Sequence, residues 1–200
     1  MELIVISDPV CFEGEADLIN ALFDAGMAVF HLRKPDTDKS TYAGLISKIA
    51  KQYHGGIALH QFHELAEDFP LIKRLHYPEQ HRKASLNAIV DLNGYTLSTS
   101  IHHLTALHEL KGFDYAFYGP VFNSISKPGY EGLKKENLML PDKDRPVKII
   151  GIGGIDEEKV QRLKEMGFDG IAVLGTIWNN KPQAVNNFKS LITRHKEHFN

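Results

Sequence analysis

The sequence predicts an α/β protein built as a compact (β/α)8 barrel, the TIM-barrel architecture. Short apolar runs recur eight times, segments of helical period separate them, and glycine-containing turns follow the last two runs. The 200 residues, 42% hydrophobic and 24% charged, have the composition of one globular domain spanning residues 1–200. Such barrels typically need ~250 residues, so the connections should be trimmed. An open doubly wound sheet is the alternative.

The eight predicted strands are short apolar runs rich in β-branched or aromatic residues. In chain order they are Leu3 to Ser7, Val29 to Leu32, Ile57 to Leu59, Arg74 to His76, Tyr95 to Thr99, Tyr115 to Tyr118, Val147 to Ile150 and Ile171 to Leu174. The fourth has the weakest signal. Alternation of these strands with helical segments favours a parallel sheet.

Helical periodicity occupies most of the connections. The predicted helices are Glu15 to Ala25, Thr41 to Tyr53, His63 to Asp68, His103 to Lys111, Glu157 to Met166 and Pro182 to His195. Ser40 is the expected N-cap of the second helix, and Gly26 follows the first, where helix ends favour glycine. Residues 78–93 give no clear pattern. We expect His54 and His195 to lie at the surface.

Composition favours a small-molecule partner. Twenty-three basic and 25 acidic residues give a net charge of −2, which leaves no excess positive charge to neutralise a nucleic acid or an anionic membrane. No apolar run approaches the ~20 residues that cross a bilayer, and no secretory leader pattern precedes the first strand. We therefore expect a cytoplasmic protein, with homo-oligomerisation left open. Cys11 cannot form an internal disulfide and is expected to pack as a small hydrophobe.

Two turns follow the last two predicted strands. Gly153 and Gly154 come after the seventh strand, and Gly175 and Thr176 come after the eighth. Glycines let backbone N–H groups approach an anion, and a helix N-terminus adds the positive end of its dipole. Barrels commonly build a phosphate site from these two loops. We expect the four residues to bind phosphate, although each turn taken alone could simply be a tight βα connection.

A long loop from Gly119 to about Gly132 follows the sixth predicted strand. Loops of this length inside a compact domain more often have a functional role than serve only as connections. Ser124, Ser126 and Lys127 could donate several hydrogen bonds to a phosphate or diphosphate. An ordinary polar turn is the alternative.

Four motifs occur in the order typical of the thiamine-phosphate synthase/TenI family. They are His31-Leu32-Arg33, Ser100-Ile101-His102, the loop Gly119 to Lys127 and the turn Ile152 to Ile155. On these motifs the chain resembles that family from its first strand to its eighth. The resemblance implies a (β/α)8 barrel, a role in thiamine biosynthesis, and small-molecule substrates, namely a thiazole phosphate and, in synthases, a pyrimidine diphosphate.

The resemblance also implies roles for individual residues. In a synthase, diphosphate leaves the pyrimidine methylene group and the thiazole nitrogen attacks the resulting cation. Ser100 would position the pyrimidine amine, and the leaving charge would be stabilised by Arg33, Ser124, Ser126 and Lys127. In a TenI-like tautomerase, His102 or His31 would act as the acid/base. A non-catalytic binder of a phosphate ligand is the third hypothesis.

The chain departs from the family pattern where synthases hold Mg²⁺. Gln61 and His81 stand where the resemblance implies metal-binding aspartates. Mg²⁺ prefers hard, anionic oxygen ligands, so we assign no metal ligand and leave Mg²⁺ open as a cofactor. We expect Mg²⁺-dependent coupling far below that of an ordinary family member and thiazole phosphate binding that is independent of Mg²⁺. Pro35 replaces a lysine that would contact diphosphate, but we expect the adjacent Lys34 to help to attract the diphosphate. Pro120 replaces the histidine implied for tautomerases.

Histidines gather near the predicted carboxyl ends of the second to fifth strands, at His31, His60, His76 and His102. Barrel active sites lie at this end, so we expect His31 and His60 to contact substrate. The group could supply an acid/base or ligands for a transition metal. Hydrogen-bonded residues at the barrel mouth are the alternative, and no short metal-binding motif such as H-E-x-x-H is present.

Overall fold

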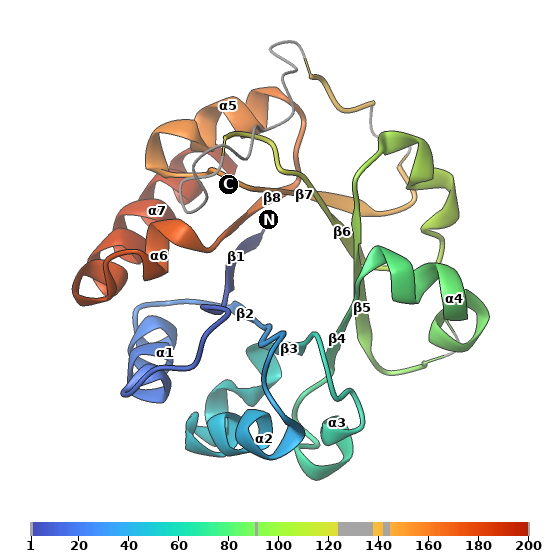
Figure 1. Ribbon diagram of the computed structural model, residues 1–200. Helices are drawn as coiled ribbons and strands as arrows, with labels where there is room; N and C mark the ends of the chain where they lie inside the picture. Colours follow the sequence, from blue (N-terminus) through green and yellow to red (C-terminus); the bar gives the residue numbers. More distant parts are fainter. Residues whose placement is uncertain (1, 91, 124–137, 142–144, 200) are drawn as a thin grey trace.

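The computed structural model describes residues 2–90, 92–123, 138–141 and 145–199. Within these residues, parallel strands close into a barrel in the order β1 to β8. Figure 1 shows the strands as a central ring with the helices outside it. The strands are β1 (Glu2–Ile6), β2 (Val29–Leu32), β3 (Ile57–Leu59), β4 (Arg74–Tyr77), β5 (Thr96–Ile101), β6 (Tyr115–Tyr118), β7 (Lys148–Ile152) and β8 (Gly170–Val173).

Strand β1 closes the barrel by pairing on both sides. Ile4 lies opposite Val29 of β2 and opposite Ala172 of β8, and both ladders are parallel. The expected (β/α)8 barrel is confirmed, and the open doubly wound sheet is wrong. Closure leaves no exposed sheet edge among these strands.

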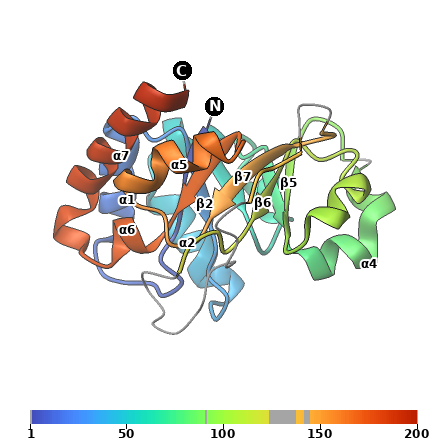
Figure 2. The same ribbon diagram turned by 90° about the horizontal axis from the view of Figure 1, so that it is seen from above.

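Helices and 3₁₀ turns surround the ring. Figure 2 shows α1, α6 and α7 on one side of the barrel and α4 on the opposite side. The α-helices are α1 (Glu15–Asp24), α2 (Lys39–Lys48), α3 (Leu65–Asp68), α4 (Glu79–Val90), α5 (Val160–Glu165), α6 (Gly175–Trp178) and α7 (Ala184–Phe199). The 3₁₀ turns are η1 (Lys51–Gly56), η2 (Leu104–Glu109), η3 (Glu157–Lys159) and η4 (Lys181–Gln183).

Several connections differ from the predicted helices. Asp38, not Ser40, caps α2, because its carboxylate accepts a hydrogen bond from the Thr41 N–H at 3.0 Å. The predicted helix over Thr41 to Tyr53 is two elements, α2 and η1. The connection between β5 and β6 is the 3₁₀ turn η2, which suits its short length. The segment without a clear pattern contains α4.

The two faces of each strand have different surroundings. Residues such as Val5 and Phe30 point outward and pack with the helices into the main hydrophobic core. The alternate residues fill the barrel interior, because strand side chains point to opposite faces in turn. The apolar part of this interior comes from Ile4, Ile6, Val29, Tyr115, Phe117, Ile150 and Ala172. Inward positions on β2, β4 and β5 instead carry buried His31, His76 and Ser98.

Three expectations about exposure are wrong. Cys11 is exposed, with Sγ 3.8 Å from the Thr37 hydroxyl. His54 is buried, and its Nε2 lies 3.0 Å from the Ile49 carbonyl. His195 of α7 is also buried, which lowers its pKa to about 4. Their local sequence gives no sign of these tertiary surroundings.

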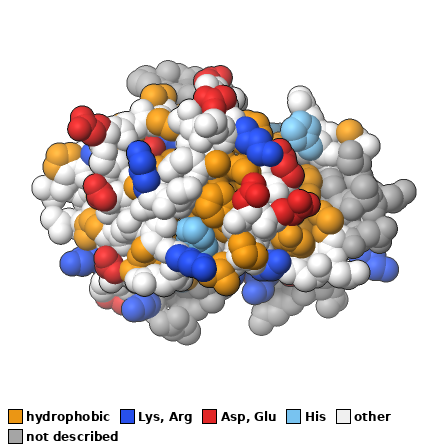
Figure 3. All heavy atoms as spheres, turned by 90° about the horizontal axis from the view of Figure 1, so that it is seen from below, with side chains coloured by type: hydrophobic (Ala, Val, Ile, Leu, Met, Phe, Trp, Pro, Cys, Tyr) orange, Lys and Arg blue, Asp and Glu red, His pale blue; other side chains and the backbone are white. Residues whose placement is uncertain are grey.

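The outer surface mixes both signs of charge. On the face seen in Figure 3, acidic and basic side chains are interspersed around hydrophobic ones, in keeping with the small net charge. Among the described residues, no helix has the length and apolarity to cross a membrane.

Candidate active site

A cleft of about 620 Å³ lies at the carboxyl ends of the strands. Its wall comes from the ends of β1, β6 and β7 and from the residues that end or follow β2 to β5. The lining residues are Ile6, Arg33, His60, His76, Pro78, Glu79, Gln80, Lys83, Ser100, His102, His103, Phe117 and Ile152. Four expected site residues, Arg33, His60, Ser100 and His102, therefore share one cleft, in the usual position for a barrel active site.

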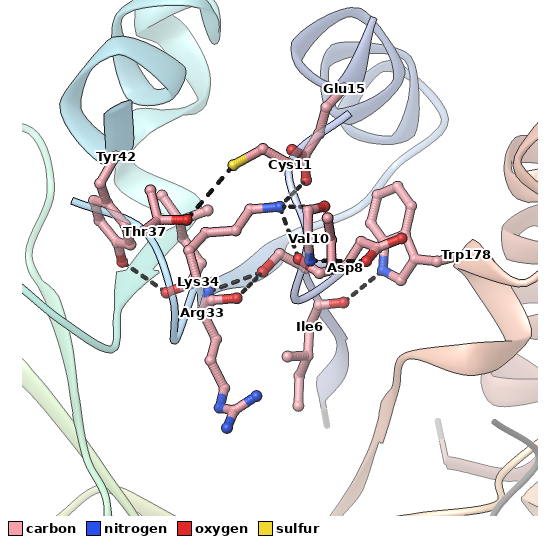
Figure 4. Close-up of polar contacts among 12 residues, drawn as sticks. Ile6, Asp8, Val10, Cys11, Glu15, Arg33, Lys34, Thr37, Tyr42 and Trp178 are labelled. Carbon is pink, nitrogen blue, oxygen red and sulfur yellow. Dashed lines mark hydrogen bonds and ion pairs between the residues drawn. The ribbon is translucent and has the colours of Figure 1, made fainter. Parts of the chain in front are cut away.

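Arg33 offers a cation to this cleft. The Ser7 hydroxyl holds the Arg33 backbone from both sides, accepting from its N–H at 2.9 Å and donating to its carbonyl at 2.8 Å. In Figure 4 the Arg33 side chain extends away from the neighbouring Lys34 side chain. Because Arg33 is exposed and its backbone is fixed, its guanidinium can approach an anionic ligand.

Lys34 has a different role from the one that its position beside Arg33 suggests. Its ammonium group is fully buried and donates to Glu15 at 2.5 Å, to the Asp8 carbonyl at 2.7 Å and to the Val10 carbonyl at 3.2 Å. Figure 4 shows these contacts, which join the loop after β2 to the loop after β1 and to the start of α1. An ammonium has three donors, and all three are used. Lys34 is therefore a structural cation, and the expectation that it helps to bind diphosphate is wrong.

Ser100 is oriented by a buried histidine. His76 lies between two hydroxyls of β5, with Nδ1 3.0 Å from Ser98 Oγ and Nε2 3.0 Å from Ser100 Oγ. Burial lowers the pKa of His76 to about 3, so its ring is neutral at physiological pH. A neutral ring can donate at one nitrogen and accept at the other, which fixes the direction of the Ser100 hydroxyl.

His102 lies at the rim of the cleft. Its Nε2 is 3.9 Å from Glu79 Oε2, and its Nδ1 is 3.4 Å from the Gly119 carbonyl. Glu79 also pairs with Lys83 at 2.8 Å, and this hydrogen bond contributes most to lowering the pKa of the carboxyl. His102 is exposed, so a ligand in the cleft can reach its ring.

His31 does not line the cleft. Its side chain is wholly inside the barrel, with Nδ1 2.8 Å from His60 Nε2 and Nε2 2.7 Å from the Tyr115 hydroxyl. Burial holds the pKa of both histidines well below the usual value, with nearby positive charges adding to the effect. The expected substrate contact of His31 is not available in this arrangement, whereas His60 reaches the cleft floor.

The two glycine turns contact each other, and their binding of phosphate stays a prediction. The Thr176 hydroxyl at the start of α6 donates to the Ile155 carbonyl of the turn after β7. Gly153 and Gly154 both have positive φ values, +100° and +65°. A Cβ on Gly154 would lie 2.2 Å from the Asn123 carbonyl oxygen, so glycine is also required for packing against the segment after β6.

Several cleft residues were not predicted from the sequence. Glu79, Lys83 and His103 follow strand ends, and α4 falls in the segment without a clear pattern. The hydroxyl of Tyr115 contacts His31, and the Tyr115 side chain points into the barrel like that of Phe117, two residues further along the same strand. Alternation along β6 is the signal that could have identified it.

Comparison with known proteins identifies the family of this chain. A family model described as thiamine monophosphate synthase matches residues 3–177. The chain belongs to the thiamine monophosphate synthase/TenI family. Curated relatives named thiamine-phosphate synthase include one from Clostridium tetani, 42% identical over 66 residues, and one from Pyrococcus abyssi, 29% identical over 111 residues. The match to the Clostridium tetani protein covers 33% of this chain and 32% of that protein. The match to the Pyrococcus abyssi protein covers 56% of this chain and 48% of that protein.

Solved structures resemble the whole barrel. A thiamine phosphate pyrophosphorylase from Bacteroides thetaiotaomicron superposes with a TM-score of 0.79 at 27% identity, covering 98% of each chain. One from Pyrococcus furiosus gives a TM-score of 0.78 at 16% identity, covering 100% of this chain and 97% of its own, a similarity that supports the fold alone.

Gln61 and His81, which the family resemblance places at the metal positions, do not fit Mg²⁺. The side-chain oxygen Oε1 of Gln61 accepts a hydrogen bond from the backbone N–H of Lys34 at 3.2 Å, and His81 is not among the residues that line the cleft. Glu79 is the carboxylate in the cleft lining, but Lys83, Arg82 and His102 surround it. Mg²⁺ would need hard, anionic oxygen ligands that are free to bind it.

The remaining expected site residues, Ser124, Ser126 and Lys127, lie outside the described residues. Their roles in binding phosphate or diphosphate stay predictions from the family motif Gly119 to Lys127.

Proposed function

We propose that this family member binds a thiazole phosphate in the cleft and joins it to a pyrimidine diphosphate, with little dependence on Mg²⁺. The observation that carries the proposal is the convergence of Arg33, Ser100 and His102 on one cleft. The family to which the chain belongs supports the substrate class.

Arg33 would act on the leaving group. The bond between the pyrimidine methylene carbon and the diphosphate oxygen breaks, and its electron pair leaves with the diphosphate. The thiazole nitrogen then forms a bond to that carbon. A guanidinium that is exposed to the cleft can bind diphosphate oxygens in two-point contacts, and the charge that it stabilises grows as the bond breaks.

Ser100 would orient the pyrimidine. Its hydroxyl is fixed by the neutral His76, so it presents one defined hydrogen-bonding direction to an exocyclic amine. The two glycine turns and Thr176 would bind the phosphate of the thiazole, with Ser124, Ser126 and Lys127 adding donors to the diphosphate. No step in this scheme uses a metal.

The test is formation of thiamine phosphate from the two substrates, with Mg²⁺ and with EDTA. We expect a slow reaction that changes little between the two conditions, and thiazole phosphate binding that is unaffected by Mg²⁺. The double variant Gln61→Asp/His81→Asp should gain Mg²⁺-dependent activity. Robust Mg²⁺-dependent coupling by the unaltered protein would overturn the proposal of a metal-independent reaction.

A tautomerase is the second candidate function, favoured by the contact between His102 and Glu79. This pair could move a proton on a bound thiazole phosphate, with His102 as the acid/base and Glu79 stabilising its charged form. NMR detection of tautomer conversion that is lost in His102→Gln would support it. Binding without either reaction would instead indicate a non-catalytic ligand binder.

A further inference from the structure

We propose that His31, His60 and His76 form a binding site for a divalent transition metal ion such as Zn²⁺ on the floor of the cleft. One ligand nitrogen from each histidine falls within 4.8 Å of the others. The site is separate from the Mg²⁺ positions of the family, which Gln61 and His81 occupy.

The strands bring these three side chains together. His31 lies on β2, His60 directly follows β3 and His76 lies on β4, and these strands are consecutive neighbours in the barrel. All three point inward, with His31 0%, His60 7% and His76 1% exposed. Inward residues of a (β/α)8 barrel stack in layers, and alternate strands such as β2 and β4 contribute to one layer, so the backbone fixes the spacing of the three rings.

The outer nitrogens of two rings are already held. His31 Nε2 contacts the Tyr115 hydroxyl at 2.7 Å, and His76 Nδ1 contacts Ser98 Oγ at 3.0 Å. Histidines that bind metals almost always use their second nitrogen in this way, because the contact fixes the ring and its tautomer. His31 Nδ1, His60 Nε2 and His76 Nε2 would then bind the metal, and His76 Nε2 would exchange its 3.0 Å contact with Ser100 Oγ for the ion.

Only small movements are needed to bind an ion. Tetrahedral Zn²⁺ with bonds of ~2.0–2.1 Å requires ligand nitrogens about 3.3 Å apart. His31 Nδ1 and His60 Nε2 are now 2.8 Å apart and must separate slightly. The stacked rings of His60 and His76, with centroids 4.0 Å apart, must open to direct both nitrogens at one point.

Ligand chemistry decides which metal fits. Three neutral imidazoles suit Zn²⁺, Co²⁺, Ni²⁺ or Cu²⁺ and suit Mg²⁺ poorly. Three protein ligands leave one position of a tetrahedral ion open, as in catalytic zinc sites. Since His60 and His76 line the cleft, that position would face it and could accept water or a ligand atom.

The test is titration of untagged, chelator-stripped protein with Co²⁺, followed by competition with Zn²⁺, in the absence of any substrate. We expect one equivalent of Co²⁺ to give the visible bands of a four-coordinate ion with imidazole ligands, and Zn²⁺ to displace it. Because no substrate is present, the result is independent of the coupling or tautomerase activity.

Matched variants locate the site. His60→Asn and His76→Asn should each weaken Co²⁺ binding at least 100-fold, whereas His108→Asn, at an exposed position, should leave it unchanged. Tyr115→Phe should weaken binding ~10–100-fold with one ion still bound, as expected of a positioning residue. Circular dichroism checks that each variant is folded.

A measurement on the unaltered protein tests the site even if the variants fail to fold. Saturating Zn²⁺ should raise its Tm, because an ion that binds the folded protein more tightly than the unfolded chain stabilises it. Absence of four-coordinate Co²⁺ bands, or equal loss of binding in His108→Asn, would overturn the proposal.

Discussion

Lys34 Nζ and Glu15 Oε1 form an ion pair of 2.5 Å in which both side chains are sealed from solvent. Burial raises the pKa of Glu15, and the Lys34 ammonium acts against this effect. Arg33, the next residue along the chain, instead lies beside the cleft. Two adjacent cations therefore have separate roles, one in folding and one in the candidate site.

Lys34→Met should destabilise the fold by about 3–5 kcal/mol, because it leaves the Glu15 carboxylate buried without its cation. Urea unfolding measures the change. The double variant Glu15→Leu/Lys34→Met should recover most of the loss, since it removes both buried charges. A single variant that costs less than about 1 kcal/mol would show that the pair contributes little.

Arg33→Gln should weaken binding of inorganic diphosphate 10-fold to 100-fold, while the free energy of unfolding stays the same. The magnitude follows from loss of a charged hydrogen bond of about 1.5–3 kcal/mol. Lys83→Gln is the matched control, because Lys83 lines the same cleft but is neutralised by Glu79 at 2.8 Å. Isothermal titration calorimetry should find a smaller effect for Lys83→Gln, and equal losses would contradict a specific role for Arg33.

Gly154→Ala should cost at least twice as much stability as Gly94→Ala. Both glycines have positive φ values, +65° and +85°, so each substitution carries strain of about 1–2 kcal/mol. A Cβ at Gly94 meets nothing within 4 Å, whereas one at Gly154 meets the Asn123 carbonyl oxygen. Urea unfolding compares the two variants.

The same Gly154→Ala variant should weaken binding of thiazole phosphate, because the added methyl displaces the turn that is proposed to bind its phosphate. Gly94→Ala should bind normally. Unchanged affinity in a folded Gly154→Ala protein would place the phosphate site elsewhere.

His195 should contribute to loss of stability in acid. Its pKa is about 4 in the folded protein, against an ordinary value of 6.5. As the pH falls from about 6.5 to 4, the unfolded chain takes up a proton that the folded chain does not, so folding becomes less favourable. His195→Gln should therefore lose less stability than the unaltered protein over this range.

The free energy of unfolding at several pH values measures this difference. His108→Gln, at an exposed position, controls for removal of a histidine as such. Identical pH profiles for the unaltered protein and His195→Gln would contradict the assignment.

Much of the architecture follows from the sequence. Runs such as Val29 to Leu32 and Tyr115 to Tyr118 match the observed strands β2 and β6 residue for residue. Their local composition is sufficient, because a short β-branched or aromatic run flanked by turn residues has few alternatives. The motif positions Arg33, Ser100 and His102 also identified part of the cleft, since strand ends of a parallel barrel meet on one side.

The tertiary structure decided the roles of side chains whose local sequence looks alike. Lys34 and Arg33 are adjacent cations, yet Glu15, 19 residues away in the chain, makes Lys34 structural. His31 lies within β2 and His102 directly follows β5, yet His31 is sealed beside Tyr115 whereas His102 is exposed at the rim. Sequence patterns fix which face of a strand a residue occupies, but burial, pKa and hydrogen-bond partners depend on atoms that only closure of the barrel brings within reach.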